Sequence, residues 1–178
     1  MNSNLDQILE DKEQIRWQGG ISSKILTLKL FTLLFILLLF SGAFLGIAQF
    51  SQSFAWLSFL VCLAFILVAY FSDRVKVFTI TDKRIIIKSG LIGTDYNSIY
   101  FTEVKTADVS VGLIDKIFSV GTITINTGKI ESIGSKQSQI QIVDKLSSID
   151  TPYAVYKILQ STLSSRQESL YSGRADQK

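Results

Sequence analysis

The ionisable side chains that could do chemistry are few and scattered in this chain of 178 residues. It has no histidine, which is the usual acid or base near neutral pH and the commonest metal ligand. Its one cysteine, Cys62, excludes both a disulfide within the chain and a zinc site built from cysteines. Glu103, Asp108 and Asp115 lie apart on expected strands and turns, so none pairs with another for acid–base work. We therefore predict a non-enzyme with no catalytic residue, metal, cofactor or small-molecule substrate.

Basic side chains form the one cluster whose chemistry points to a ligand. Each cation near an anionic lipid surface contributes up to about 1 kcal/mol of binding. The same charges are expected wherever a cytoplasmic segment flanks a membrane span, so both interpretations stay open. Nucleic acid is not an expected ligand, because the cluster lacks interleaved aromatic residues and a known binding motif. The cluster comprises Arg74, Lys76, Lys83, Arg84 and Lys88.

The stretch Leu30–Ser72 would hold this cluster at a membrane, since it carries no charged residue. A single helix of this length would reach about 65 Å, whereas the hydrocarbon core of a bilayer is only about 30 Å thick. The polar residues 49–53 divide the stretch into two expected spans, at about 30–48 and 54–71. The sequence thus predicts a transmembrane hairpin over residues 25–72, preceded by an N-terminal segment, residues 1–24.

The distribution of lysine and arginine predicts the orientation of this hairpin. Arg16, Lys24 and Lys29 precede it, the basic cluster follows it, and its turn has no charge. Because cytoplasmic flanks carry the excess of basic residues, we expect both termini in the cytoplasm and a multi-pass protein of the inner cell membrane. A cleaved signal peptide is the alternative, but the first apolar run is too long for one and a second follows at once.

Small residues recur at helical spacing in both expected spans. Gly42 and Gly46 form a G-x-x-x-G pair, and Ala55, Ser58 and Cys62 form a stripe on the second helix. Small side chains let two helices approach closely in lipid, so we expect these two sets to face each other. Pairing of the two glycines between subunits stays open as the alternative.

From Asp73 onward, alternating β-branched residues predict a mainly β domain over residues 73–166. An antiparallel meander of about seven strands would close into a barrel or sandwich. A helix that begins at Pro152 would cap it, with Val155, Leu159 and Leu163 against the sheet. The remaining residues, 167–178, form a polar tail. Strands are expected at 74–81, 84–88, 94–101, 104–111, 121–128, near 130–133 and at 139–143.

Three shorter segments complete the prediction. Leu5, Ile8 and Leu9 recur at helical spacing, which predicts a short helix near the N-terminus. Ile15 and Trp17 alternate with polar residues and fit either a short strand or a segment at the membrane interface. Residues 113–118 suit one packed helical turn, and Ile123 and Ile125 are expected to face the core of the domain.

Four stretches of the chain occur in an order typical of one family. They are Thr81-Asp82-Lys83-Arg84-Ile85, the turn at residues 90–93, the run from Ile99 to Val109, and the run from Leu113 to Ile123. Together with Glu13, Ile15 and Trp17 upstream, they resemble the bacterial pleckstrin-homology (PH-like) domain family, specifically its YdbS/YdbT-like group of small membrane proteins. Tyr100 and Thr106 depart from that family's proline and acidic residue. The resemblance implies a two-sheet barrel closed by a C-terminal helix and carries over no catalytic residue.

These observations favour a non-enzymatic, membrane-anchored PH-like module that docks proteins or assembles at the inner membrane face. Its partners would be membrane lipid and either another protein or a second copy, held at a sheet edge or beside the capping helix. The alternatives are a membrane-active hairpin, such as a pore or permeability factor, and a domain that senses anionic lipid. Specific phosphoinositide recognition is not expected, because the turn at Asp82-Lys83 is too short.

Overall fold

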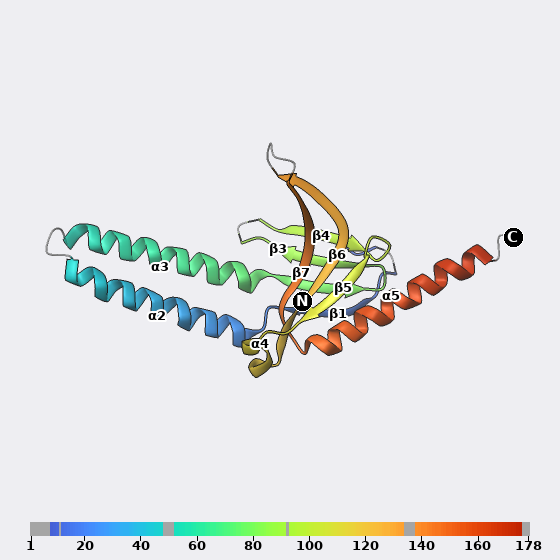
Figure 1. Cartoon of the computed structure of the whole chain (residues 1–178), viewed down its shortest axis with the longest axis horizontal. Coiled ribbons are helices and arrows are strands. Elements are labelled where there is room, and N and C mark those ends of the chain that lie inside the picture. The colour runs from blue at the N-terminus through green and yellow to red at the C-terminus, as the bar shows by residue number, and fades with distance from the viewer. Residues whose placement is uncertain (1–7, 11, 48–51, 92, 134–137, 176–178) are drawn as a thin grey trace.

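In the computed structural model, two packed helices project from one side of a two-sheet β domain, and a third long helix leaves the opposite side (Figure 1). The structure describes residues 8–10, 12–47, 52–91, 93–133 and 138–175. Over residues 40–47, 52–58, 131–133, 138–141 and 166–175 it describes the backbone alone.

The first sheet joins strands that lie far apart in the sequence. It consists of β1 (Ile15–Gly20), β2 (Val77–Thr81), β3 (Arg84–Ser89) and β4 (Asp95–Tyr100), in that order and antiparallel throughout. The helices α2 (Ser23–Ile47) and α3 (Gln52–Val75) lie between β1 and β2 in the chain. Since Gly20 is paired with Val77, the helix pair is anchored at both ends in two neighbouring strands.

The second sheet contains β5 (Thr106–Ser110), β6 (Val120–Ile133) and β7 (Ser138–Asp150), again antiparallel and in chain order. A short helix, α4 (Leu113–Phe118), connects β5 to β6. The last element, α5 (Pro152–Ala175), begins beside the sheets and runs away from α2 and α3 (Figure 1). The predicted antiparallel meander with a C-terminal capping helix is confirmed.

Apolar side chains from both sheets and from α5 form one core. Ile123 and Ile125 are fully buried, as predicted from the alternation. Val155 and Leu159 are also buried and Leu163 packs beside them, which confirms the predicted stripe on α5. Full burial of one such side chain stabilises the fold by about 1.5–3 kcal/mol. The core comprises Phe78, Ile80, Ile85, Ile99, Phe101, Ile123, Ile125, Leu146, Ile149, Val155 and Leu159.

Several boundaries differ from the prediction. Residues 74 and 75 belong to the end of α3, because the helix continues past the last apolar residue of the chain's uncharged stretch. The expected strands at 121–128 and 130–133 are one long strand, β6, with a register shift between Asn126 and Ile130. Gly128 lies in that shift with φ +72°, a conformation that glycine adopts without steric cost.

The N-terminal predictions have different outcomes. Ile15 and Trp17 form part of β1, so the strand interpretation is confirmed. Ile8 and Leu9 lie in a turn rather than in a helix, while Leu5 lies outside the described residues. A buried carboxylate, Glu13, holds this turn in place, which the helical spacing did not reveal.

The prediction of a transmembrane hairpin is wrong for the described part of the chain. Over those residues, no helix offers a stretch both long enough and apolar enough to cross a membrane. Lys24 and Lys29 lie inside α2, and Asp73 and Arg74 lie inside α3, because both helices extend beyond the expected spans. The structure instead has two apolar helices packed side by side (Figure 1).

Candidate binding surfaces

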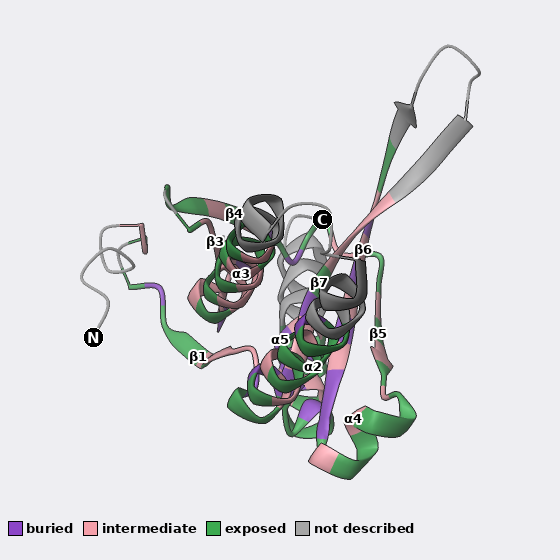
Figure 2. Cartoon of the chain, turned by 90° about the vertical axis from the view of Figure 1, so that its left-hand side faces the viewer, coloured by how far each residue is buried: buried purple, intermediate pink, exposed green. Residues whose placement is uncertain are grey.

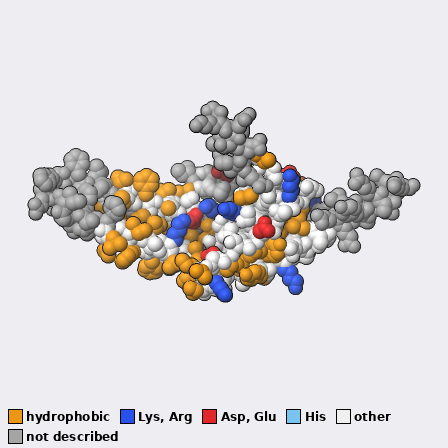
Figure 3. Space-filling model, in the orientation of Figure 1, with side chains coloured by type: hydrophobic (Ala, Val, Ile, Leu, Met, Phe, Trp, Pro, Cys, Tyr) orange, Lys and Arg blue, Asp and Glu red, His pale blue; other side chains and the backbone are white. Residues whose placement is uncertain are grey.

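The helix pair carries an extensive exposed apolar surface. Leu26 and Leu37 are buried, but most other large side chains of the two helices are exposed, Phe65 by 71%. Figure 3 shows these hydrophobic side chains over the described part of both helices. Contiguous exposed apolar surface of this kind marks a contact with lipid or with another protein. The exposed residues are Phe31, Leu34, Phe35, Ile36, Leu38, Leu39, Leu60, Val61, Phe65, Leu67, Val68 and Phe71.

Polar contacts fix the base of this helix pair on the β domain. Ser22, directly before α2, donates its backbone N–H to Ser148 at 2.8 Å and its hydroxyl to Asp150 at 2.8 Å. Both acceptors lie on β7, so the start of α2 is attached to the second sheet as well as to β1. The base of the helix pair is therefore attached to both sheets.

Asp73 links the two helices to each other and to the chain that enters β2. Its carboxylate accepts hydrogen bonds from the ammonium groups of Lys29 on α2 and of Lys76, the latter at 2.9 Å. Burial of Asp73 acts to raise its pKa, but the hydrogen bonds and charges of the two lysines outweigh burial and lower the pKa below its usual value. Asp73 is therefore a carboxylate at neutral pH and neutralises part of the positive charge at the helix base.

The structure divides the predicted basic cluster between two ends of a strand pair. Arg74, Lys76 and Lys88 lie where β2 begins and β3 ends, because Val77 is paired with Lys88. Lys83 and Arg84 lie at the opposite end, about 13 Å further along the strands. Arg74 is exposed, Lys76 is bound to Asp73, and the ammonium of Lys88 lies 5.9 Å from the centre of the Tyr96 ring. Figure 3 shows basic side chains where the apolar helices meet the β domain.

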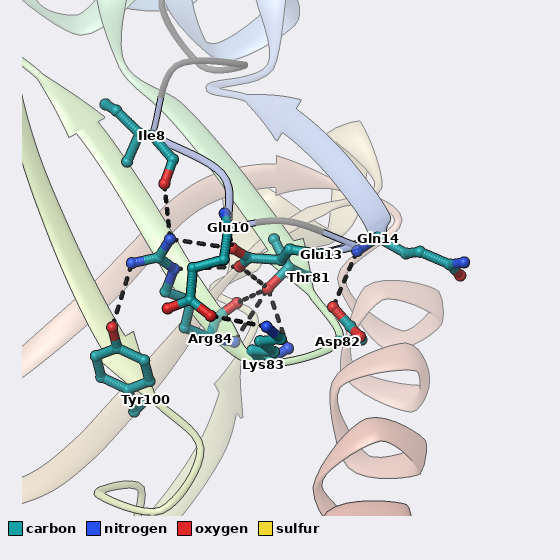
Figure 4. A network of polar contacts seen from close by, with 9 residues as sticks. All are labelled: Ile8, Glu10, Glu13, Gln14, Thr81, Asp82, Lys83, Arg84 and Tyr100. Atoms are coloured by element: carbon teal, nitrogen blue, oxygen red, sulfur yellow. Dashed lines mark hydrogen bonds and ion pairs between the residues drawn. The ribbon is translucent and has the colours of Figure 1, made fainter.

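Arg84 is part of a buried network beside the start of β1, at the end of the strand away from the helix pair (Figure 4). Its Nε and Nη2 donate to the two carboxylate oxygens of Glu13 at 3.1 and 3.0 Å. The Glu13 side chain is 0% exposed and that of Arg84 is 9% exposed. Arg84 also donates to the carbonyl of Ile8 at 2.8 Å and to the hydroxyl of Tyr100 at 3.3 Å. All its nitrogens thus have partners within the protein, which makes it a structural residue rather than a free lipid ligand.

The remaining contacts of Glu13 complete its hydrogen bonding. Thr81 donates its hydroxyl to Glu13 at 2.7 Å, and the backbone N–H of Glu10 donates at 2.9 Å. Burial acts to raise the Glu13 pKa, but these hydrogen bonds, with Arg84 first, lower the pKa below its usual value. Glu13 in turn raises the pKa of Arg84 against the opposing effect of burial. Both groups therefore stay charged over the whole physiological pH range.

Lys83 forms an exposed ion pair with Glu10, next to this network. Its ammonium lies 2.7 Å from a carboxylate oxygen of Glu10, and this hydrogen bond raises the pKa of Lys83. Two of the five predicted lipid contacts, Lys83 and Arg84, therefore form ion pairs with the N-terminal segment. Contact of the other three with lipid stays a prediction.

A groove of about 480 Å³ lies between the start of β5 and α5. The hydroxyl of Tyr156 on α5 donates to the carbonyl of Ala107 on β5 at 3.0 Å, and Gln160 donates to that hydroxyl at 2.8 Å. An added strand would compete with Tyr156 for this carbonyl, so the groove favours a ligand held by side chains. Its lining includes two lysines and no acidic residue: Val104, Lys105, Thr106, Ala107, Lys157, Gln160, Ser161, Leu163 and Ser164.

The other predicted residues lie apart from these surfaces. Gly42, Gly46, Ala55 and Ser58 fall where the side chains are not described, and Cys62 is exposed on α3. Packing between these two sets stays a prediction. Glu103 pairs with Lys129 at 3.3 Å, while Asp115 accepts a hydrogen bond from the backbone of Gly112 at 3.2 Å.

The described residues contain no group of three or more potential metal ligands that could hold an ion. Sequence analysis missed two features of these surfaces. Glu13 entered the prediction only as part of a family motif, because Arg84 follows it by 71 residues and local spacing cannot show such a pairing. The apolar face of α4 was expected to be packed, but Leu113 is 88% exposed.

The comparisons with known proteins agree with this architecture. The family model of the bacterial PH domain matches residues 25–161, and the chain belongs to that family. No curated protein and no solved structure matched the chain. PH domains are generally binding modules, so family membership supports a binding role rather than a catalytic one.

Proposed function

We propose that this bacterial PH domain protein is a non-enzymatic binding module held at the cytoplasmic face of a membrane by the apolar surface of α2 and α3. The observation that carries the proposal is the exposure of large apolar side chains on both helices, beside a domain whose own core is complete. Water is an unfavourable environment for such a surface, and lipid is a favourable one.

The charges at the helix base support this location. Lys24, Lys29 and Arg74 are exposed where the apolar surface ends and the β domain begins. Cations at this level would lie at the headgroups when the apolar side chains contact the acyl chains. Because α2 and α3 are anchored through β1, β2 and β7, lipid contact would also fix the orientation of the β domain.

The groove beside α5 supports a protein ligand for the module. It lies on the side of the domain from which α5 leaves, opposite the helix pair (Figure 1), and would stay accessible at a membrane. Lys105 and Lys157 favour an acidic, extended peptide segment of a neighbouring membrane protein. Binding of a fluorescent acidic peptide tests this role, with Lys105→Glu/Lys157→Glu as the disrupting variant and Lys145→Glu as the control. Equal binding by all three proteins would contradict it.

Co-flotation of the full chain with lipid vesicles tests membrane attachment. We expect the wild-type protein to float with vesicles that contain phosphatidylglycerol, and Phe35→Glu/Phe65→Glu to stay at the bottom of the gradient. Ser164→Glu, an exposed substitution on α5, is the matched control and should float. A wild-type protein that stays monomeric and lipid-free without detergent would overturn the proposal.

A further inference from the structure

The short helix α4 presents an apolar face that has no role in the fold. Leu113, Ile114 and Ile117 are 88%, 58% and 78% exposed, and no residue of the helix is buried. With 3.6 residues per turn, positions i, i+1 and i+4 fall within about 100° of arc, so these three side chains project from the same side of the helix. A scattered exposed leucine needs no explanation, but three large apolar side chains on one helical turn form a contact surface.

This face lies at the base of the apolar helix pair. Lys24, in the first turn of α2, donates its ammonium group to the carbonyl of Phe118 at the end of α4, at 3.3 Å. Figure 2 looks at the molecule from the side on which α2 and α3 project, and it shows α4 exposed beside the base of α2. The apolar face of α4 and the apolar surface of the helix pair are therefore neighbours on the side that would meet a membrane.

The charges around α4 suit an anionic surface. Lys24 and Lys116 are both exposed at its edge. The one acidic residue of the helix, Asp115, accepts the backbone N–H of Gly112 at 3.2 Å, so its carboxylate faces the start of the helix. Two cations beside three exposed apolar side chains are the composition of a segment that lies in the headgroup region of a bilayer.

We propose that α4 is a second lipid contact, which inserts Leu113, Ile114 and Ile117 into the headgroup region of an anionic bilayer beside the base of α2. This inference rests on the proposed membrane attachment through α2 and α3. A six-residue helix is too small to bind lipid firmly by itself, but the helix pair holds it next to the surface at high effective concentration. Two separate contacts would prevent the β domain from tilting about the helix pair.

Site-specific fluorescence in the full chain tests the inference. Cys62→Ser removes the native thiol, and single cysteines then carry an environment-sensitive nitrobenzoxadiazole probe at one of three positions: Ile117→Cys on α4, Phe35→Cys on α2, or Ser164→Cys on α5. The labelled proteins are bound to phosphatidylcholine vesicles with or without phosphatidylglycerol. Some of the lipids carry a nitroxide quencher, near the headgroup in one set of vesicles and on the acyl chain in another, and a probe counts as unquenched only when neither set quenches it. We expect several-fold stronger quenching at positions 117 and 35 than at position 164, and an increase at 117 when phosphatidylglycerol is present.

The outcomes separate this inference from the proposed function. Quenching at position 35 together with an unquenched probe at 117 would overturn the role of α4 and leave membrane attachment standing. An unquenched probe at position 35 would overturn both. A blue shift at 117 without lipid quenching would assign the face to a protein contact and overturn the inference. As a second variant, Ile117→Glu should weaken the quenching of a probe at Leu113→Cys, whereas Ile117→Leu should preserve it.

Discussion

Replacing Glu13 by glutamine tests the buried ion pair that ties the N-terminal segment to β2 and β3. Glutamine keeps the shape of the side chain but removes its charge and turns one acceptor into a donor. The Glu13 carboxylate accepts from Arg84 Nε and Nη2, from Thr81 and from the Glu10 N–H. Since the Glu13 side chain is 0% exposed, no water can replace a lost acceptor without local opening.

The expected loss of stability follows from the partners of Glu13 that the substitution would leave without a carboxylate. Removing one member of a buried ion pair destabilises a protein by about 3–5 kcal/mol, because the other charge stays buried without a counter-charge. The two hydrogen bonds from Arg84 lead to a similar figure, at about 1.5–3 kcal/mol for each bond to a charged group. We therefore expect Glu13→Gln to lower the free energy of unfolding by about 3–5 kcal/mol. Glu13→Leu/Arg84→Met removes both charges and should cost less than the single change.

Urea unfolding of the full chain in mild detergent measures this loss. Trp17 on β1 packs against the core and reports detachment of that strand, and Trp56→Phe removes the other tryptophan signal. Lys83→Met, which removes the exposed pair with Glu10, is the control and should leave the midpoint nearly unchanged. A loss below about 1 kcal/mol for Glu13→Gln, the range of exposed ion pairs, would refute the reasoning.

Three further predictions concern pH, the core and the bulge in β6. Because the Glu13 pKa is lower in the folded than in the unfolded protein, its stabilisation is complete above the usual glutamate pKa of about 4.3 and is lost as pH falls through the folded value. The difference in stability between wild type and Glu13→Gln should thus shrink on acidification, and a constant difference would contradict this. Leu159→Ala should lower the free energy of unfolding by about 2–5 kcal/mol, measured by urea unfolding, while the exposed change Ser164→Ala should not. Gly128→Ala should lower the free energy of unfolding by about 1 kcal/mol, because φ at this position is +72°. Gly93→Ala should lower it by less in the same assay, because a Cβ added there would meet no neighbouring atom.

The sequence predicted those parts of the fold that depend on local alternation. Ile123 and Ile125 alternate with polar residues, and Val155 and Leu159 recur at helical spacing, so their burial could be foreseen. The helix pair shows where this method fails. Apolar composition identified the uncharged stretch, but the ends of α2 and α3 depend on contacts with the β domain, such as those of Lys24 and Ser22. Composition cannot show such contacts, and the predicted spans left out the charged turns at the helix base.

The binding surfaces depend even more on tertiary pairing. Arg84 and Lys88 are both basic residues of one predicted strand. In the structure, Arg84 is buried against Glu13, whereas Lys88 lies near the helix base. Only the antiparallel return of β3 separates them, and only the pairing of β1 with β2 brings Glu13 into reach. A basic cluster in a sequence is therefore a list of candidates, and strand register decides which of them face a ligand.

The position of the helix pair between β1 and β2 explains why a buried ion pair is useful at the other end of β1. Any force on α2 from a membrane acts directly on β1, which is an edge strand with one neighbour. A slip of one residue would turn Trp17 from the core to the opposite face. Burial of Trp17 opposes such a slip, and Glu13 adds to this because it reaches both Arg84 and Thr81 in one register only. With Ser22 bound to β7 at its other end, β1 is fixed on both sides of the point where the helix pair would pull.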